Sequence, residues 1–266
     1  MVLMNYEDLL NTDSLDVCFE HFHGELPFDH CIIDNFIVEP VISDLELEFL
    51  SYESDRWFRY ENVLENKKAL NDWNVFPSLT YRTLSTLCST AFVTKLSTLC
   101  GVPLIADNGL HGGGWHVHGP NGNLNPHLDY SIHPKLGLLR KLNLIIYVSR
   151  HLKEEHGGHL GLWEHDQDNN CPGKLVKEIA PLYNRAVLFD TTQNSWHGMS
   201  RPLTPPPGVL RKSLALYFLC KPPTGAECRG RALFAARYEQ RGDKSVADLI
   251  KQRSDVNGSL TCYRIP

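Results

Sequence analysis

The sequence predicts a mainly β domain with flanking helices, an α+β arrangement whose strands form a sandwich or barrel of the jelly-roll kind. Two patterns support this fold class. Apolar residues recur at helical spacing within the first hundred residues, and from Gly109 onward short β-prone runs alternate with Gly, Pro, Asn and His. The chain has 266 residues, of which 42% are hydrophobic, so it can bury one large core. We therefore expect residues 1–266 to form a single domain.

The first part of the chain, residues 1–108, is expected to supply one strand and helical support. Residues 28–37 (FDHCIIDNFI) predict a strand. Residues 40–53 (PVISDLELEFLSYE) begin with proline and continue with apolar residues at helical spacing, which predicts a helix. Residues 83–100 (TLSTLCSTAFVTKLSTLC) repeat apolar positions at intervals of three and four, so a single buried helix is expected there.

The second part, residues 109–222, is expected to form the β core, and the last part, residues 223–266, a helical tail. The predicted core strands are bounded by turn residues and cover residues 141–149, 158–164, 185–192, 196–200 and 212–220. In the tail, RALFAARY and SVADLIKQR are both predicted to be helical, and Ser245 with Asp248 fits a capping box at the start of the second helix.

Composition excludes several classes of protein. A net charge of −5 and a pI near 6.2 give no general attraction to nucleic acid or anionic membranes. No apolar run approaches the roughly 20 residues of a membrane span, and the first residues lack the basic region and apolar stretch of a secretory signal. Eight cysteines without a C-x-x-C pair favour free thiols. We expect a cytoplasmic protein that binds neither nucleic acid nor membranes.

The stretch NPHLDYS predicts part of a metal site, because it places a histidine and an aspartate two positions apart. On an extended backbone, residues i and i+2 point to the same face, so His127 and Asp129 can grip one ion. Two histidines and one carboxylate on one side of an octahedral metal leave three positions open. His197, in the strand-like run SWHGMS, is the best candidate for the third ligand.

Other histidines compete for this role, since the chain has 13 of them. His116 and His118 in GWHVHG share the two-residue spacing but lack a nearby carboxylate. They either line the mouth of the site or bond to loop backbone, and the sequence leaves both readings open.

An arginine gives the metal hypothesis independent support. Arg211 opens the run RKSLALYF, and its guanidinium is expected to enter the barrel at the metal's end, where it can hold a carboxylate in a bidentate manner. Ser213 lies on the same strand face and leaves room for a bound acid. On the run KLNLIIYVS, Asn143 and Tyr147 share one face, and the Tyr147 hydroxyl is a second candidate contact for that acid.

The ordered set of motifs resembles a known family. It comprises FDHCIIDNFI (28–37), HLD (127–129), NLIIYVS (143–149), GGHLGLW (157–163), NRAVLFDTT (184–192), WHG (196–198) and RKSLALYF (211–218). Together these resemble the Fe(II)- and 2-oxoglutarate-dependent oxygenases, and within them the prolyl-hydroxylase-like branch.

The resemblance implies a double-stranded β-helix (jelly-roll, cupin-like) core over residues 109–222, with Fe(II) held by His127, Asp129 and His197. It implies 2-oxoglutarate as cosubstrate, with its far carboxylate on Arg211 and Tyr147 and with Asn143 and Ser213 beside it. The implied activity is a dioxygenase reaction in which O2 and 2-oxoglutarate yield succinate and carbon dioxide while a substrate C–H bond is hydroxylated. Ascorbate is a further expected cofactor of this class. The expected substrate is a small molecule or a peptide or protein.

Two other functions use the same residues. A metal-dependent cupin acting as a hydrolase, isomerase or lyase would need the three ligands but not Arg211. A non-catalytic binding module of this fold would need neither turnover nor the complete set.

Overall fold

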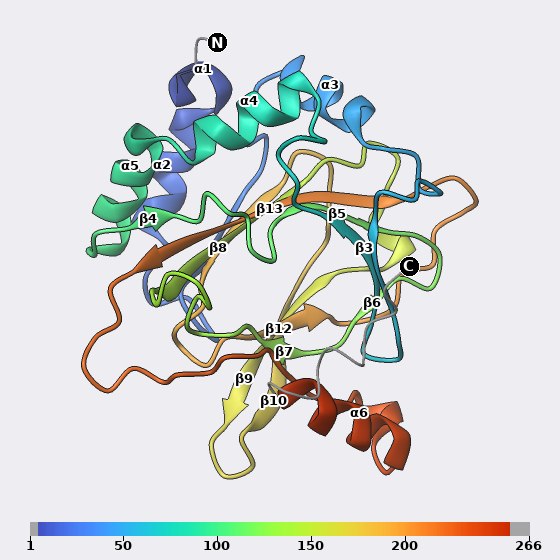
Figure 1. The fold of residues 1–266 in the computed structure, drawn as a ribbon. Coiled ribbons are helices and arrows are strands. Elements are labelled where there is room, and N and C mark those ends of the chain that lie inside the picture. Colours follow the sequence, from blue (N-terminus) through green and yellow to red (C-terminus); the bar gives the residue numbers. More distant parts are fainter. Residues whose placement is uncertain (1–4, 256–266) are drawn as a thin grey trace.

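The computed structural model describes residues 5–255, which form two antiparallel sheets facing each other, with most helices packed outside the larger one (Figure 1). Within these residues the larger sheet has nine strands, in the order β1-β11-β8-β13-β5-β3-β2, with β4 paired to β13 and β6 to β3. Its strands are β1 (His30–Ile33), β2 (Phe58–Glu61), β3 (Glu65–Leu70), β4 (Ile105–Ala106), β5 (Gly114–His118), β6 (Asn123–Leu124), β8 (Leu139–Tyr147), β11 (Ala186–Asp190) and β13 (Arg211–Cys220).

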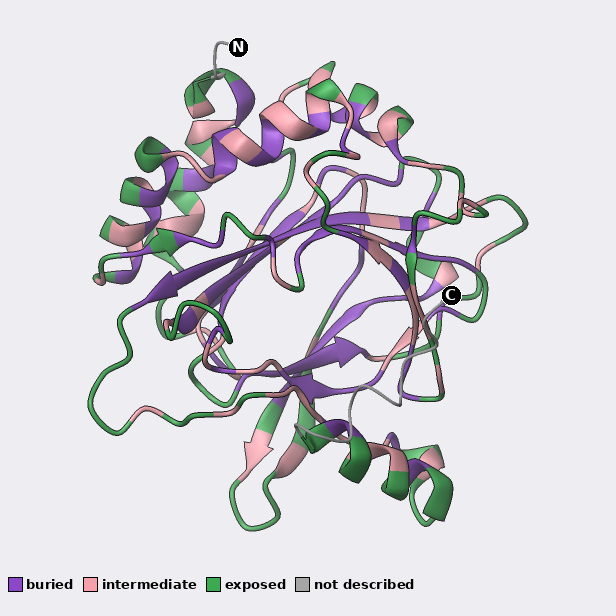
Figure 2. Ribbon diagram, in the orientation of Figure 1, coloured by how far each residue is buried: buried purple, intermediate pink, exposed green. Residues whose placement is uncertain are grey.

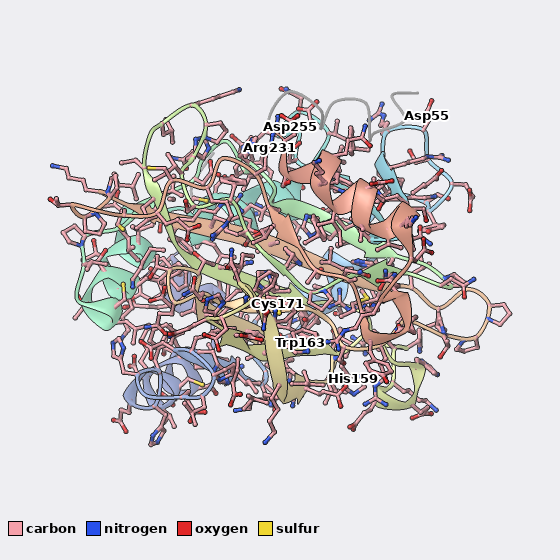
Figure 3. The ribbon with its side chains drawn as sticks, turned by 90° about the horizontal axis from the view of Figure 1, so that it is seen from below. Asp55, His159, Trp163, Cys171, Arg231 and Asp255 are labelled. Atoms are coloured by element: carbon pink, nitrogen blue, oxygen red, sulfur yellow. The ribbon has the colours of Figure 1, made fainter. Side chains whose placement is uncertain are left out.

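The smaller sheet runs in the order β10-β9-β12-β7-β14. Its strands are β7 (His127–Leu128), β9 (Leu160–Asp166), β10 (Cys171–Ile179), β12 (Trp196–Met199) and β14 (Leu233–Phe234). On it, Leu128, Trp163 and Trp196 form a buried cluster of their own, and Trp163 is labelled in the view from below (Figure 3). The two sheets together give the curled double-stranded β-helix that the sequence predicted.

The helices lie mainly over the outer face of the larger sheet. They are α1 (Tyr6–Leu9), α2 (Thr12–Glu20), α3 (Val41–Glu48), α4 (Ser78–Leu87), α5 (Thr90–Cys100) and α6 (Lys244–Ser254), with 3-10 turns η1 (Glu154–His156) and η2 (Tyr238–Gln240). In Figure 1, α1, α2, α4 and α5 lie above β8 and β13, while α6 lies beside the smaller sheet. Figure 2 shows that buried residues follow the strands and the inner sides of these helices.

Strand alternation decides which side chains face the helices and which face the space between the sheets. On β8, Leu142, Leu144 and Ile146 belong to the large core shared with the helices. Ile145 and Tyr147 point the other way, into a smaller apolar cluster between the sheets. The face division predicted for residues 141–149 is therefore confirmed.

Four local predictions for the outer parts of the chain are wrong. The helix expected over residues 83–100 is two helices, because Ser89 leaves helical geometry and its side chain accepts a hydrogen bond from the Phe92 N–H as a new N-cap. Apolar spacing continues across the break, so periodicity alone does not reveal it. The support region also contains the β2–β3 hairpin, which extends the larger sheet beyond β5.

The tail differs as well. Leu233 and Phe234, expected in a helix, instead pair with Leu128 and His127 as strand β14. Helix α6 begins at Lys244, and the cap is Asp243, whose carboxylate accepts from the Ser245 N–H, rather than the predicted capping box.

None of the helices in residues 5–255 combines the length and the apolar character that crossing a bilayer requires. Seven of the eight cysteines lie in the described residues and are free thiols there, and Cys262 lies outside them.

Candidate active site

The structure brings His127, Asp129 and His197 together between the two sheets. His127 on β7 and His197 on β12 are direct cross-strand partners, so their side chains lie on the same face. The Nε2 atoms of both histidines lie 3.8 Å from an oxygen of the Asp129 carboxylate, and the three donor atoms all fall within 4.8 Å of one another. Among the described residues, this is the one group of three His, Cys, Asp or Glu side chains that close together.

Backbone carbonyls orient both imidazoles. The Nδ1 atom of His127 lies 2.9 Å from the Asn125 carbonyl oxygen, and that of His197 lies 2.8 Å from the Ser195 carbonyl oxygen. With Nδ1 occupied, each ring presents Nε2 to the interior, as metal-ligating histidines do. Burial lowers the pKa of His127 to about 3 and also lowers that of His197, so both rings are neutral near pH 7 and their Nε2 lone pairs are free to bind a metal.

Asp129 is held as a carboxylate. Burial raises its pKa, but the positive charge of Arg140 and the effect of the two histidines outweigh burial and bring the pKa down to about 2. Its Oδ2 atom is buried and has no hydrogen-bond partner among the described residues. A buried carboxylate oxygen without a partner beside two neutral imidazoles is a donor set that fits Fe(II) in a 2-His-1-carboxylate arrangement.

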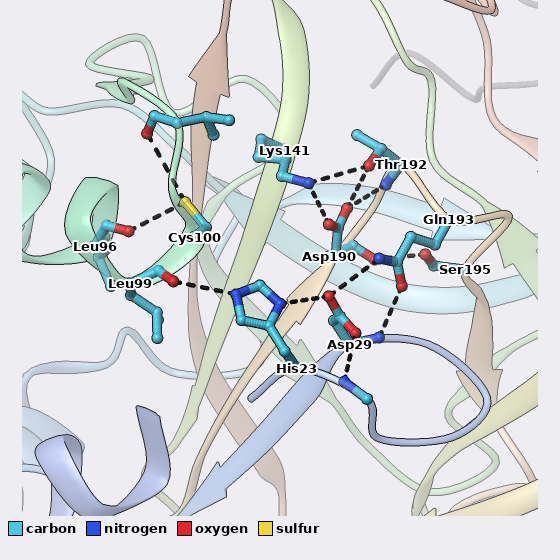
Figure 4. Close-up of polar contacts among 12 residues, drawn as sticks. His23, Asp29, Leu96, Leu99, Cys100, Lys141, Asp190, Thr192, Gln193 and Ser195 are labelled. Carbon is cyan, nitrogen blue, oxygen red and sulfur yellow. Dashed lines mark hydrogen bonds and ion pairs between the residues drawn. The ribbon is translucent and has the colours of Figure 1, made fainter. Parts of the chain in front are cut away.

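A hydrogen-bond network fixes the turn that precedes His197 (Figure 4). The buried Asp190 carboxylate at the end of β11 accepts hydrogen bonds from Lys141 Nζ and from both the N–H and the hydroxyl of Thr192. The Ser195 hydroxyl donates to the Asp190 carbonyl. Since Ser195 also supplies the carbonyl that orients His197, this network sets the position of the third ligand.

Arg211 forms the second part of the site. Its side chain is buried at the start of β13, where Nη2 donates to the Tyr147 hydroxyl at 3.1 Å and Nε to the Gly158 carbonyl at 2.9 Å. No ion pair joins Arg211 to a carboxylate within residues 5–255 (compare the pairs made by Arg140 and Arg185). Burial lowers the pKa of Arg211 and raises that of Tyr147, so a buried cation stands beside a neutral hydroxyl. Such a pair suits the carboxylate of a small acid.

Arg211 and the metal ligands lie at different positions along β13. Arg211 opens the strand, whereas Asp129 lies near Tyr217, six residues further on, since Arg140 contacts both. The expectation that the guanidinium enters the barrel at the metal's end stays a prediction. An acid that contacts both groups has to lie along the strand between them.

The two remaining predicted residues lie between these positions. Ser213 pairs with Tyr147 across the strands, and Asn143 pairs with Tyr217. The Asn143 side-chain oxygen is buried without a partner among the described residues, which leaves an acceptor available to a ligand.

His116 and His118 lie on β5, where His118 is the cross-strand neighbour of Arg211 and His116 that of Ser213. This register puts both rings on the face of the larger sheet that carries Arg211 and Ser213, which favours a role beside the site over hydrogen bonding to a loop backbone. Burial and the positive charge of Arg211 lower the pKa of His118, so its ring is neutral.

Sequence reasoning missed Lys67 and Arg140. Lys67 shares a face of β3 with Ala69, which pairs with His116, so it lies at the rim of the same cavity. Its Nζ atom is 3.5 Å from Glu65. Strand alternation placed Arg140 on the helix side with Leu142, but a bulge in the β8–β13 pairing turns its side chain toward Asp129. No feature of the sequence predicts that bulge.

Comparisons with known proteins agree with this geometry. Residues 113–219 match the family model of the 2OG-Fe(II) oxygenase superfamily. This segment carries the three predicted metal ligands and Arg211, and the match agrees with the Fe(II), 2-oxoglutarate and O2 expected from the sequence.

Individual relatives point to prolyl hydroxylases. A stretch of 92 residues is 33% identical to the prolyl 3-hydroxylase OGFOD1 of Xenopus laevis, which is 33% of this chain and 17% of that protein. The chain thus matches about a sixth of the curated relative's length.

Solved structures show the shared fold. A prolyl 4-hydroxylase from Phytophthora capsici aligns with a TM-score of 0.54 and 20% identity over 96% of this chain and 77% of its own. A Trichoplax adhaerens prolyl hydroxylase in complex with a hypoxia-inducible-factor peptide aligns with a TM-score of 0.51 and 15% identity, over 79% and 91%. The 2-oxoglutarate-dependent epimerase SnoN from nogalamycin biosynthesis has a TM-score of 0.51 and 10% identity, over 85% and 87%. The predicted fold is confirmed by these neighbours.

Proposed function

We propose that this protein is an Fe(II)- and 2-oxoglutarate-dependent dioxygenase that hydroxylates a C–H bond of a peptide or protein substrate. The observation that carries the proposal is the joint presence, between the two sheets, of a largely buried His-Asp-His cluster and a buried arginine that has no carboxylate partner within residues 5–255. Bound Fe(II) and 2-oxoglutarate would supply oxygen activation, with succinate and carbon dioxide as the products of the cosubstrate.

The residues of this chain would divide the work by position. His127, Asp129 and His197 would hold the metal from one side and leave its other side open. Arg211 and Tyr147 would fix the far carboxylate of 2-oxoglutarate through charge-assisted hydrogen bonds, and so orient its other end toward the metal.

Apolar residues would keep water out of the site. Phe189 lies against His197, with ring centroids 4.7 Å apart, and belongs with Leu160 and Leu162 to the buried cluster between the sheets. Because such walls leave few partners for stray water, they would confine the reaction to a substrate that reaches the open side of the metal.

The substrate class rests on the names of relatives. The matched protein from Xenopus laevis is a prolyl 3-hydroxylase, and the Trichoplax neighbour was solved with a peptide. A prolyl residue in a peptide or protein is therefore the proposed target. A small-molecule substrate is the second candidate, since SnoN belongs to nogalamycin biosynthesis and shares the fold.

Anaerobic binding tests the proposal directly. Protein loaded with Fe(II) should develop the weak visible absorption band of the 2-oxoglutarate chelate when 2-oxoglutarate is added, and Asp129→Ala should abolish it. Arg150→Ala, which removes an exposed arginine, is the matched control and should keep the band. Fe(II) binding without the band and without affinity for 2-oxoglutarate would favour the cupin hydrolase, isomerase or lyase instead.

Turnover then separates an enzyme from a binding module and identifies the substrate. Succinate formation should rise when proline-containing peptides are added, and mass spectrometry should find a gain of one oxygen on the peptide. Ascorbate dependence and a cytoplasmic location stay predictions, which the same turnover assay and cell fractionation would test.

A further inference from the structure

Arg140 is the most heavily constrained cation near the proposed metal site. Its side chain is 2% exposed and lies between two aromatic rings, with Cζ 3.5 Å from the ring centroid of Tyr130 and 3.4 Å from that of Tyr217. Its Nη2 donates to the His111 carbonyl and to the Tyr130 hydroxyl. A planar guanidinium held on both faces and at one edge has little freedom to rotate.

The remaining edge of the guanidinium faces Asp129. Arg140 Nη1 lies 3.5 Å from Asp129 Oδ1, while Asp129 Oδ2 has no hydrogen-bond partner among the described residues. Each carboxylate oxygen lies 3.8 Å from the Nε2 atom of one ligand histidine, Oδ1 from His127 and Oδ2 from His197, and only Oδ1 also faces the fixed cation.

The backbone around Asp129 is fixed as well. Arg229 Nε donates to the Asp129 carbonyl at 2.8 Å, and the Arg140 N–H donates to the Ser131 carbonyl at 2.8 Å. With the main chain tied at these points, the orientation of the carboxylate depends on what holds its side-chain oxygens.

We infer that Arg140 is a positioning residue that holds Asp129 through Oδ1, so that Asp129 offers the metal one oxygen, Oδ2, rather than both. A carboxylate that chelated with both oxygens would fill a position that the cosubstrate or oxygen needs. Tyr130 and Tyr217 stack on the guanidinium and keep it in place, and the Tyr217 hydroxyl also interacts with Asp129 itself. The inference rests on the metal site of the proposed function.

Partners of metal ligands commonly change affinity by about 10- to 100-fold when removed. Arg140→Lys should therefore raise the dissociation constant for Co(II) by about that factor, because lysine keeps the charge but loses the planar fork and its stacking. Visible absorption of bound Co(II) reports coordination geometry, and it should change in the same variant. Both readouts are independent of turnover.

Further variants keep the test decisive if a change at Arg140 disturbs folding. Tyr217→Leu leaves Arg140 in the chain but removes one stacking ring, and it should weaken Co(II) binding in the same direction. Tyr217→Phe keeps the ring and should bind more tightly than Tyr217→Leu. Arg185→Lys changes an arginine whose Nε lies 2.6 Å from Asp34, away from the triad, and is the matched control that should bind Co(II) like wild type.

The outcomes are distinguishable. Wild-type protein that bound no Co(II) would overturn the proposed metal site itself. Wild-type binding together with equal affinity and an identical spectrum in Arg140→Lys and Tyr217→Leu would leave the metal site standing and overturn the role of Arg140.

Discussion

Replacing Arg211 by methionine should separate the stability of the protein from its affinity for 2-oxoglutarate. In the ligand-free protein the Arg211 guanidinium is 5% exposed and bonds to a tyrosine hydroxyl and a carbonyl, without a carboxylate in the described residues. A buried cation without a counter-charge costs free energy, and replacing it with an apolar side chain of similar length removes that cost. The Arg211→Met variant should therefore melt at the same temperature as wild type or higher when no ligand is present.

When 2-oxoglutarate is bound, wild type should instead be more stable than Arg211→Met. Hydrogen bonds to charged groups are worth roughly 1.5–3 kcal/mol each, so losing two of them costs about 3–6 kcal/mol of binding. That corresponds to a dissociation constant between about 100-fold and about 20,000-fold higher. Tyr147→Phe removes one neutral donor and should cost less, about 10- to 100-fold.

Zn(II)-loaded protein allows both quantities to be measured without turnover. At 2-oxoglutarate concentrations of about 100 times its dissociation constant, wild type should gain roughly 2.7 kcal/mol of stability, seen as a rise of several degrees in melting temperature. The variant should show almost no rise at the same concentration. If Arg211→Met bound 2-oxoglutarate within threefold of wild type by calorimetry, the assignment of Arg211 as the carboxylate partner would be wrong.

Three further predictions concern the scaffold. Burial holds the pKa of His118 well below its usual value of about 6.5, so the unfolded chain protonates first as pH falls. Below pH about 6.5 this residue alone should remove up to roughly 1.4 kcal/mol of native stability per pH unit. Urea unfolding of His118→Phe should show a shallower drop, and an unchanged slope would refute this. Gly198→Ala should weaken Co(II) binding about tenfold or more, although it replaces no metal ligand. An added Cβ would lie 2.6 Å from the Asn125 carbonyl oxygen and push β12 away from β7. Calorimetry that found wild-type affinity for Co(II) would contradict this prediction. Arg253→Ala should lower the free energy of unfolding by up to about 3–5 kcal/mol, because it removes the buried cation beside the Glu65 carboxylate and leaves only Lys67, 3.5 Å away, to balance its charge. A loss below about 1 kcal/mol in urea unfolding would show that the pair contributes little.

The strands that the sequence predicted well are those with one apolar and one polar face. In residues 141–149 the two faces differ in side-chain type, with Leu142, Leu144 and Ile146 on one and Asn143 and Tyr147 on the other, so the side to which each points could be predicted from spacing. Their alternation fails where the pairing itself is irregular. At the start of β8 the bulge reverses the side on which Arg140 lies, and a bulge depends on the partner strand, which local sequence does not describe.

Other elements were missed because their residues have no clear periodicity. Strand β5 begins in the glycine-rich stretch HGGGWHVHG, which favours a turn locally, and pairs on both sides with β3 and β13. Strand β10 contains Pro172 and Gly173 and is largely exposed, so only its pairing with β9 holds it extended. In both cases tertiary pairing outweighs local preference.

The metal ligands show what spacing can and cannot establish. His30, His127 and His197 all place Nδ1 within 2.9 Å of the carbonyl two residues earlier, so this backbone device orients buried histidines generally and does not mark a metal site. His30 also has a buried Nε2 without a hydrogen bond in the described residues, but the carboxylate paired with it, that of Glu25, is partly exposed and belongs to no group of three possible ligands. What distinguishes the other two histidines is a shared buried carboxylate, Asp129, which neither ring could provide. The His-x-Asp spacing was therefore informative because of the aspartate. The proposed site depends on the neighbours, Arg140 first among them, that keep the Asp129 carboxylate charged and correctly oriented.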